Sequence, residues 1–220
     1  ISGYSGIGKT SLVREVYKPL IRQRGYFITG KFEQLHRTAP YSAVIHALQA
    51  LVNQILSEPE EKLVQIREEL LNSVGTIGQV IIDVIPEVEL IIGKQKNMFD
   101  KTAVDPNLFN LIFQNFIRVF AQAEHPLVIF LDDLQWIDNA SLKLVEELLK
   151  DAEIHHFLLV GAYRDNEVTA GHPLATTLQS LKKSQLVIDE IVLTALTQAN
   201  INQFLADTFN CSIEKTDPLS

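Results

Sequence analysis

A short motif at the start of the chain constrains its fold more than any other feature. Residues 3–10 read GYSGIGKT and fit the pattern GxxxxGK[ST] at every fixed position. In this pattern the glycines let the backbone curl tightly, so that successive N–H groups point inward at a phosphate group. The motif therefore predicts a phosphate-binding loop, which lies between a strand and a helix.

The residues that follow the loop fit the same interpretation. Residues 11–23 are expected to form a helix with Leu12, Val16 and Leu20 on one face, and its positive dipole end would point at the anion. Lys9 would reach the β- and γ-phosphates, and the hydroxyl of Thr10 would take a position on Mg²⁺. The expected nucleotide-binding residues are Gly3, Tyr4, Ser5, Gly6, Ile7, Gly8, Lys9, Thr10 and Ser11.

Two aspartates end an apolar segment in the second half of the chain. Residues 127–131 read LVIFL, which is typical of a buried parallel strand, and Asp132 and Asp133 follow directly. In a sheet that carries a phosphate loop, the acidic end of such a strand lies next to the metal ion. We expect Asp132 to hold Mg²⁺, directly or through a water molecule. Asp133 would orient the attacking water as a general base.

A second apolar segment ends in an arginine. Residues 157–162 predict a strand between the phosphate-loop strand and the acidic strand, and Arg164 follows it. In that position Arg164 would face the γ-phosphate. The alternative is an ordinary surface arginine at the end of a strand.

Strands and helices alternate along the rest of the chain. Further strands are expected at residues 26–30 and 186–193, and Ile1 and Ser2 are the remnant of a strand before the loop. Right-handed crossovers then predict an α/β fold, a three-layer α/β/α sandwich. Its parallel sheet has the order 5-1-4-3-2, with strands numbered along the chain and the first mostly truncated. Helices are expected over residues 42–56, 61–71, 105–123, 141–150, 174–181 and 197–209, with short helices within 74–95.

Composition excludes several classes of protein. The chain is 46% hydrophobic, which suits a folded domain, and its 19 basic and 27 acidic residues give a net charge of −8. An acidic chain without a basic stripe is a poor candidate for direct binding of nucleic acid. No apolar run approaches the ~18 residues of a membrane span. The single cysteine, Cys211, favours a reducing compartment, and we expect a cytoplasmic protein.

Together these motifs resemble a known family. The segments GYSGIGKT, VIFLDDLQWID and LLVGAYRDNEV are similar to an AAA-type P-loop ATPase domain of the STAND class. The segments GKFEQLHRTAPYSAVIHAL and FQNFIRVFAQAEHPLVIFLDDLQW look closer still to the ATPase module of large bacterial signalling proteins. In those proteins the module lies between a Ser/Thr kinase domain and sensor and histidine kinase domains. The resemblance covers residues 1–210.

The resemblance implies ATP and Mg²⁺ as cofactors, with Lys9 and Thr10 on the phosphates and metal. It also implies Asp132 on Mg²⁺, Asp133 on the water and Arg164 as the sensor of the γ-phosphate. Residues 1–210 would form the ATPase domain, and residues 211–220 a polar tail that leads to a lid region outside this sequence. The implied partners are ATP or ADP and flanking kinase or sensor domains of the same chain, and copies of the chain could form a homo-oligomer.

Three functions remain open at this point. The first is a regulatory switch in signal transduction that binds ATP and hydrolyses it slowly. The second is a steadily cycling ATPase, and the third is a scaffold that keeps the fold without turnover. The combination of Lys9, Thr10, Asp132 and Asp133 argues against the scaffold. Trp136 could pack over the strand end or meet a partner.

Overall fold

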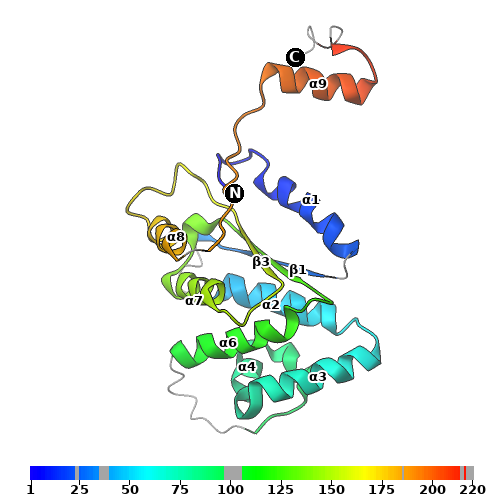
Figure 1. The fold of residues 1–220 in the computed structure, drawn as a ribbon, viewed down its shortest axis with the longest axis vertical. Coiled ribbons are helices and arrows are strands. Elements are labelled where there is room, and N and C mark those ends of the chain that lie inside the picture. Colours follow the sequence, from blue (N-terminus) through cyan, green and yellow to red (C-terminus); the bar gives the residue numbers. More distant parts are fainter. Residues whose placement is uncertain (23–24, 35–39, 97–105, 185, 214–215, 217–220) are drawn as a thin grey trace.

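The computed structural model describes residues 1–22, 25–34, 40–96, 106–184, 186–213 and 216. Its sheet consists of three parallel strands in the order β1-β2-β3 (Figure 1). The strands are β1 (Tyr26–Lys31), β2 (Leu127–Asp132) and β3 (Phe157–Gly161). Because the strands run in the same direction and start in register, their carboxyl ends meet at one edge of the sheet. That is the edge at which α/β proteins bind their ligands.

The expected first strand is present as a stub. Ser2 forms parallel bridges with Tyr163, just after β3, and with Val192. With these bridges the sheet has the expected order 5-1-4-3-2, and the prediction of an α/β fold with a parallel sheet is confirmed. The expected strand over residues 186–193 is wrong in extent, because only Val192 is paired. The neighbouring segment pairs at Ser2, and the chain then turns into the phosphate loop at Gly3, whose φ is 147°.

Alternation along the strands separates two layers of core. Ile28 and Ile129 point to the face that carries the large hydrophobic core, whereas Phe27 and Phe130 point to the opposite face. On that opposite face Phe130 packs with the buried Val13 of α1 (Lys9–Arg22). Leu12, expected on the same helical face as Val16 and Leu20, is instead exposed. The side chains of Val16 and Leu20 lie outside the described residues.

Helices cover the large core on the other face of the sheet (Figure 1). Three of them contribute most of its fully buried side chains beneath β1 and β2, including Phe113, Phe116 and Phe120. These helices are α2 (Ser42–Ile55), α6 (Pro106–Phe120) and α7 (Asn139–Lys150). A further block packs below α6 and consists of α3 (Glu60–Val74), α4 (Gly78–Val84) and α5 (Glu89–Ile92), with 3₁₀ turns at Gly75–Ile77 and Pro86–Val88.

The short helices expected within residues 74–95 are therefore confirmed. Residue 105, the expected start of the helix over 105–123, lies outside the described residues. Beyond β3 the chain forms α8 (Pro173–Lys183) and then α9 (Gln198–Phe209), which lies apart from the sheet at the end of an extended segment (Figure 1). Within the described part of the chain, no helix combines the length and the apolar character needed to cross a bilayer.

Gly30 allows α2 to pack directly on β1, and its replacement is expected to destabilise the fold. A Cβ atom at Gly30 would collide with the carbonyl oxygen of Ala43 in the first turn of α2. Because both are backbone elements of the core, Gly30→Ala should lower the free energy of unfolding by about 2 kcal/mol, as measured by urea denaturation. Gly171→Ala is the matched control, since nothing lies within 4 Å of a Cβ there. Equal stability of the two variants would contradict this packing.

Candidate nucleotide-binding site

The loop over residues 3–8 has a backbone that glycine adopts most readily at three positions, and at Gly3, with φ of 147°, a Cβ atom would also lie 2.7 Å from the carbonyl oxygen of Leu193. Gly6 has φ of 77° and Gly8 has φ of 104°, and a Cβ atom at either would meet nothing within 4 Å. Gly6 and Gly8 are therefore required by backbone conformation rather than by crowding. Helix α1 begins at Lys9, so the loop leads directly into the N-terminus of a helix. Free N–H groups and the positive end of the helix dipole favour an anion at this place.

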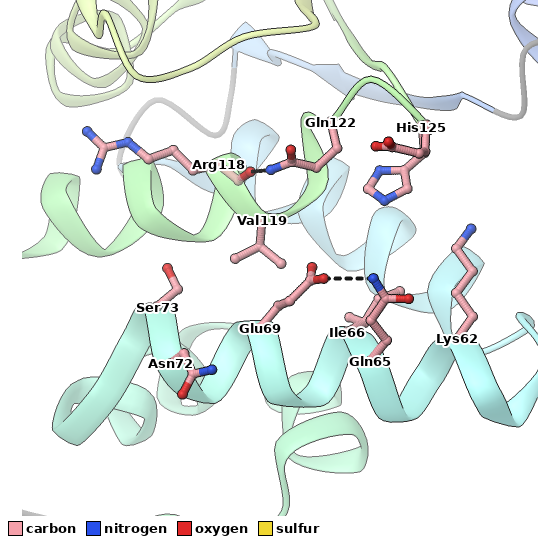
Figure 2. Close-up of a pocket in the computed structure, with 11 residues that line it drawn as sticks. Lys62, Gln65, Ile66, Glu69, Asn72, Ser73, Arg118, Val119, Gln122 and His125 are labelled. Carbon is pink, nitrogen blue, oxygen red and sulfur yellow. Dashed lines mark hydrogen bonds between the residues drawn. The ribbon is translucent and has the colours of Figure 1, made fainter.

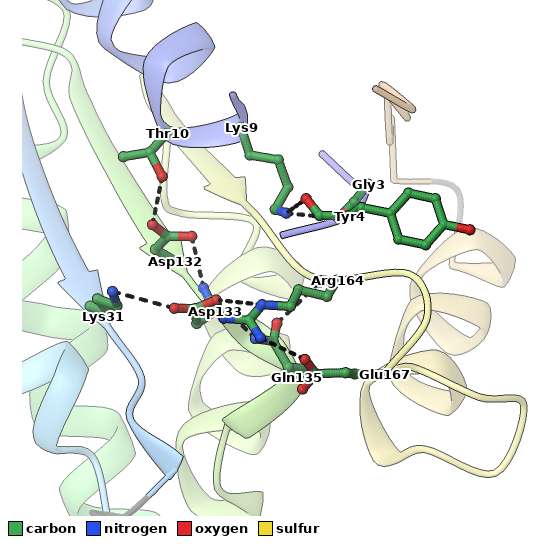
Figure 3. Close-up of polar contacts among 10 residues, drawn as sticks. All are labelled: Gly3, Tyr4, Lys9, Thr10, Lys31, Asp132, Asp133, Gln135, Arg164 and Glu167. Atoms are coloured by element: carbon green, nitrogen blue, oxygen red, sulfur yellow. Dashed lines mark hydrogen bonds and ion pairs between the residues drawn. The ribbon is translucent and has the colours of Figure 1, made fainter. Parts of the chain in front are cut away.

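Lys9 reaches back across the loop. Its Nζ donates hydrogen bonds of 2.7 Å to the carbonyl oxygen of Gly3 and 2.8 Å to that of Tyr4, and the residue is only 8% exposed (Figure 3). An ammonium group has three donors, so these two bonds leave one for a ligand. The sequence placed Lys9 on the phosphates, and the structure places its charge inside the curl of the loop that would surround them.

Thr10 and Asp132 join the loop to the acidic strand. The Oγ1 atom of Thr10, in the first turn of α1, donates a hydrogen bond of 2.9 Å to Oδ2 of Asp132, the last residue of β2. This hydroxyl and this carboxylate lie side by side, and both are oxygen ligands of the type that Mg²⁺ prefers. In proteins, the phosphates of a substrate complete Mg²⁺ sites of this kind. The residues present thus fit a Mg²⁺-nucleotide. The two residues expected to serve the metal lie together.

Asp133 points away from this pair. Its backbone has φ of 55°, in the left-handed region, and the bend separates its carboxylate from that of Asp132. The carboxylate is nearly buried and accepts a hydrogen bond of 2.8 Å from Nε2 of Gln135. Nζ of Lys31 lies 3.5 Å from Oδ2, and Nε of Arg164 lies 3.7 Å from Oδ1 (Figure 3). Asp133 is therefore the centre of a polar cluster beside the loop.

Arg164 and Trp136 belong to the same cluster. The guanidinium carbon of Arg164 lies 4.9 Å from the centroid of the Trp136 ring, a cation–π arrangement. Nη1 of Arg164 donates a hydrogen bond of 2.8 Å to Oε1 of Glu167. Of the two roles that the sequence left open for Trp136, the structure shows packing at the strand end, where the ring contacts Arg164. The structure thus brings Arg164 together with Asp133.

The sequence interpretation missed three members of this cluster, namely Lys31, Gln135 and Glu167. Lys31 had a usable signal, because it follows an expected strand beside the acidic one, and parallel strands end at a common edge. Gln135 lies in the 3₁₀ turn Leu134–Trp136, which had no signature of its own in the sequence. Glu167 follows Arg164 in a loop, where sequence gives no indication of side-chain direction.

A separate groove of about 830 Å³ lies between α3 and α6, in the helical block and away from the phosphate loop (Figure 2). Its basic side chains already have acidic partners. Lys62 pairs with Glu58 at 2.9 Å, and Arg118 pairs with Asp151 at 2.7 Å. Among the described residues that line the groove, both cations are thus paired, and we do not take the groove as the candidate site.

Comparison with known protein families gives a match that covers the phosphate loop and the acidic strand. A family model described as "AAA ATPase domain" matches residues 1–160, which include the phosphate loop, Asp132 and Asp133. Arg164, α8 and α9 lie beyond the matched range.

Relatives among characterised proteins are histidine kinases. The chain is 41% identical over 151 residues, or 68% of its length, to hybrid signal transduction histidine kinase G of Dictyostelium discoideum. It is 22% identical over its whole length to histidine protein kinase 1 of Candida albicans, and 30% identical over 95 residues, 42% of its length, to peroxide stress-activated histidine kinase mak3 of Schizosaccharomyces pombe. The matches span only 4%, 10% and 4% of these three proteins.

Proposed function

We propose a function from the premise that the chain belongs to the AAA ATPase domain family. In this proposal it binds ATP with Mg²⁺ and hydrolyses it slowly, as the regulatory module of a signalling kinase. The observation that carries this proposal is the 2.9 Å hydrogen bond between Thr10 and Asp132, which joins the phosphate loop to the acidic strand. Oxygen ligands for a Mg²⁺-nucleotide then lie beside the N–H groups of the loop.

In this proposal, different residues bind the phosphates and the metal ion. The N–H groups of the loop and Ser11 at the start of α1 bind the phosphates, and Lys9 adds a positive charge. Thr10 and Asp132 hold Mg²⁺, which supplies neutralisation of phosphate charge when bound.

The chemical step would belong to the polar cluster. Asp133 orients the attacking water and accepts its proton, and Arg164 carries the positive charge that senses the γ-phosphate. Support for this comes from the contact between the two side chains at the edge of the sheet. The family match ends at residue 160, but Arg164 and the pairing of Val192 with Ser2 lie beyond it. We therefore take residues 1–210 as one ATPase unit and residues 211–220 as its tail.

A switch, rather than a steadily cycling ATPase, is favoured by the relatives, which are named as histidine kinases. A switch has to stay in its ATP-bound state long enough for a partner to respond, so slow turnover is expected. The partners that we propose are kinase or sensor domains on the same chain, and a second copy of this chain in a homo-oligomer. The net charge of −8 gives no support to nucleic acid as a direct partner.

Titration with ATP by calorimetry, with Mg²⁺ and with a chelator, tests the proposal. Mg²⁺ should increase the affinity for ATP, and Thr10→Ala should reduce that increase by about tenfold, because it removes one oxygen ligand. The affinity of Thr10→Ala for ATP without Mg²⁺ should differ little from that of the parent. Thr176→Ala, at an exposed position of α8, is the matched control. An affinity that is independent of Mg²⁺, or no binding of ATP, would refute the proposed function.

A further inference from the structure

Gln135 is a buried polar side chain to which the proposed function gives no role. It lies in the 3₁₀ turn Leu134–Trp136 directly after the acidic strand and is only 2% exposed. A buried amide needs hydrogen-bond partners, because its desolvation is otherwise uncompensated. Its partners therefore show what the side chain does at this place.

The amide of Gln135 bridges the ends of two strands. Its Nε2 donates a hydrogen bond of 2.8 Å to Oδ1 of Asp133, and its Oε1 accepts one of 3.1 Å from the backbone N–H of Arg164 (Figure 3). The orientation of the amide follows from chemistry. A backbone N–H can only donate, so the carbonyl oxygen must face Arg164, and the NH₂ group must then face the carboxylate.

The turn that carries Gln135 is itself anchored. Nε2 of His172 lies 3.1 Å from the carbonyl oxygen of Gln135, and Nδ1 of the same ring accepts a hydrogen bond of 3.1 Å from the N–H of Leu174, at the start of α8. Since Nδ1 accepts, Nε2 carries the proton and donates a hydrogen bond to the carbonyl oxygen of Gln135. The N–H of Leu134 also donates to the carbonyl oxygen of Ala162. The backbone of the turn is thus tied to β3 and to α8.

We propose that Gln135 is a positioning residue that fixes the carboxylate of Asp133 for its work on the attacking water. This inference depends on the proposed function, which assigns that work to Asp133. The amide occupies Oδ1, so Oδ2 is the oxygen left for water. Oδ2 faces Lys31, whose side chain is 62% exposed and can move aside at little cost. Without Gln135 the carboxylate would lose the hydrogen bond that sets its angle.

Two substitutions separate the contacts of Gln135. Gln135→Glu keeps an oxygen for the N–H of Arg164 but removes the donor to Asp133. Gln135→Met, of similar length, removes both contacts without adding a charge. Both variants should hydrolyse ATP about 10- to 30-fold more slowly in single turnover and bind Mg²⁺-ATP within about threefold of the parent. Gln54→Met is the control, since Gln54 donates to the carbonyl oxygen of Phe27 at the opposite end of β1.

A double-mutant cycle with Asp133→Asn distinguishes positioning from general damage. If Gln135 acts through Asp133, then Gln135→Met should slow hydrolysis little further when Asp133 is already asparagine. A full additional loss would overturn the inference. It would also be overturned if Gln135→Glu hydrolysed at the parent rate while Gln135→Met was slow, because the contact with Arg164 alone would then matter.

Binding of a transition-state analogue provides a readout that does not need turnover. The parent should bind ADP with aluminium fluoride more tightly than ADP alone, and both Gln135 variants should lose about tenfold of that gain while their affinity for ADP is kept. If the parent shows no such gain and Asp133→Asn hydrolyses normally, the proposed function fails. If the parent shows the gain and the Gln135 variants keep it, only the role of Gln135 is refuted. Urea denaturation checks that each variant is folded.

Discussion

Lys9→Ala is expected to lower the affinity for Mg²⁺-ATP by about 100-fold. Lys9 is the basic residue of the loop, and its ammonium group lies inside the curl that would surround the phosphates. Hydrogen bonds between charged groups contribute about 1.5–3 kcal/mol each. Part of this is offset, because the ammonium already bonds to the carbonyl oxygens of Gly3 and Tyr4 before the nucleotide arrives. With the attraction between the ammonium and the phosphate charges added, a net loss of about 2.7 kcal/mol corresponds to the expected 100-fold.

Calorimetric titration of the parent and of Lys9→Ala with ATP measures this effect. The matched control is Lys94→Ala, which removes an exposed lysine from the segment after α5. Because Lys9 also holds the loop, denaturation curves of both variants are needed, and Lys9→Arg tests whether charge alone is sufficient. Unchanged affinity in Lys9→Ala would show that the loop does not bind phosphate.

Sequence patterns predicted the fold well where each element carries its own signal. The apolar run before Asp132 and the glycines of the phosphate loop depend on local chemistry, which periodicity and spacing report directly. The order of the sheet followed from the handedness of crossovers. The segment before Leu193 was predicted less well, because its pairing depends on the neighbouring segment, which meets it at Ser2. Alternation in sequence cannot report the length of a partner.

In the site, too, features with a local signal were predicted, and features that depend on tertiary contacts were not. Thr10 and Asp132 were expected on one metal ion, and the structure gives them a direct hydrogen bond. Asp133 was expected to orient the attacking water, but the sequence held no sign of the left-handed backbone that turns its carboxylate toward Gln135. Such a bend is decided by tertiary contacts of the turn, here with β3 and α8. The contact between Trp136 and Arg164 likewise joins residues from two strand ends.

Asp132→Asn and Asp133→Asn are expected to separate binding of the nucleotide from its hydrolysis. Asp132→Asn should weaken Mg²⁺-ATP binding by roughly tenfold or more, because a neutral amide is a poorer ligand than a carboxylate for a hard dication. Its amide oxygen can still accept the hydrogen bond of Thr10, so the junction between α1 and β2 should persist. The loss should be seen in the affinity measured with Mg²⁺ and not in that measured with a chelator.

Asp133→Asn should leave binding nearly intact and trap the ATP-bound state. Asparagine tolerates the left-handed backbone at this position, and its Oδ1 can still accept the hydrogen bond of Gln135, so the turn should keep its shape. The variant lacks only the group that accepts a proton from water. General-base catalysis typically contributes about 100- to 10,000-fold, and a loss of this size should appear in single-turnover hydrolysis.

Both aspartate variants are best measured side by side, with Asp207→Asn on the exposed surface of α9 as the control. The decisive quantity is the fold loss in hydrolysis rate, measured at subsaturating nucleotide, divided by the fold loss in affinity for Mg²⁺-ATP. This ratio should be large for Asp133→Asn and close to one for Asp132→Asn. If Asp133→Asn hydrolyses ATP at the parent rate, Asp133 is not the base. Its buried carboxylate would then serve only to hold Arg164 and the turn after β2 in place.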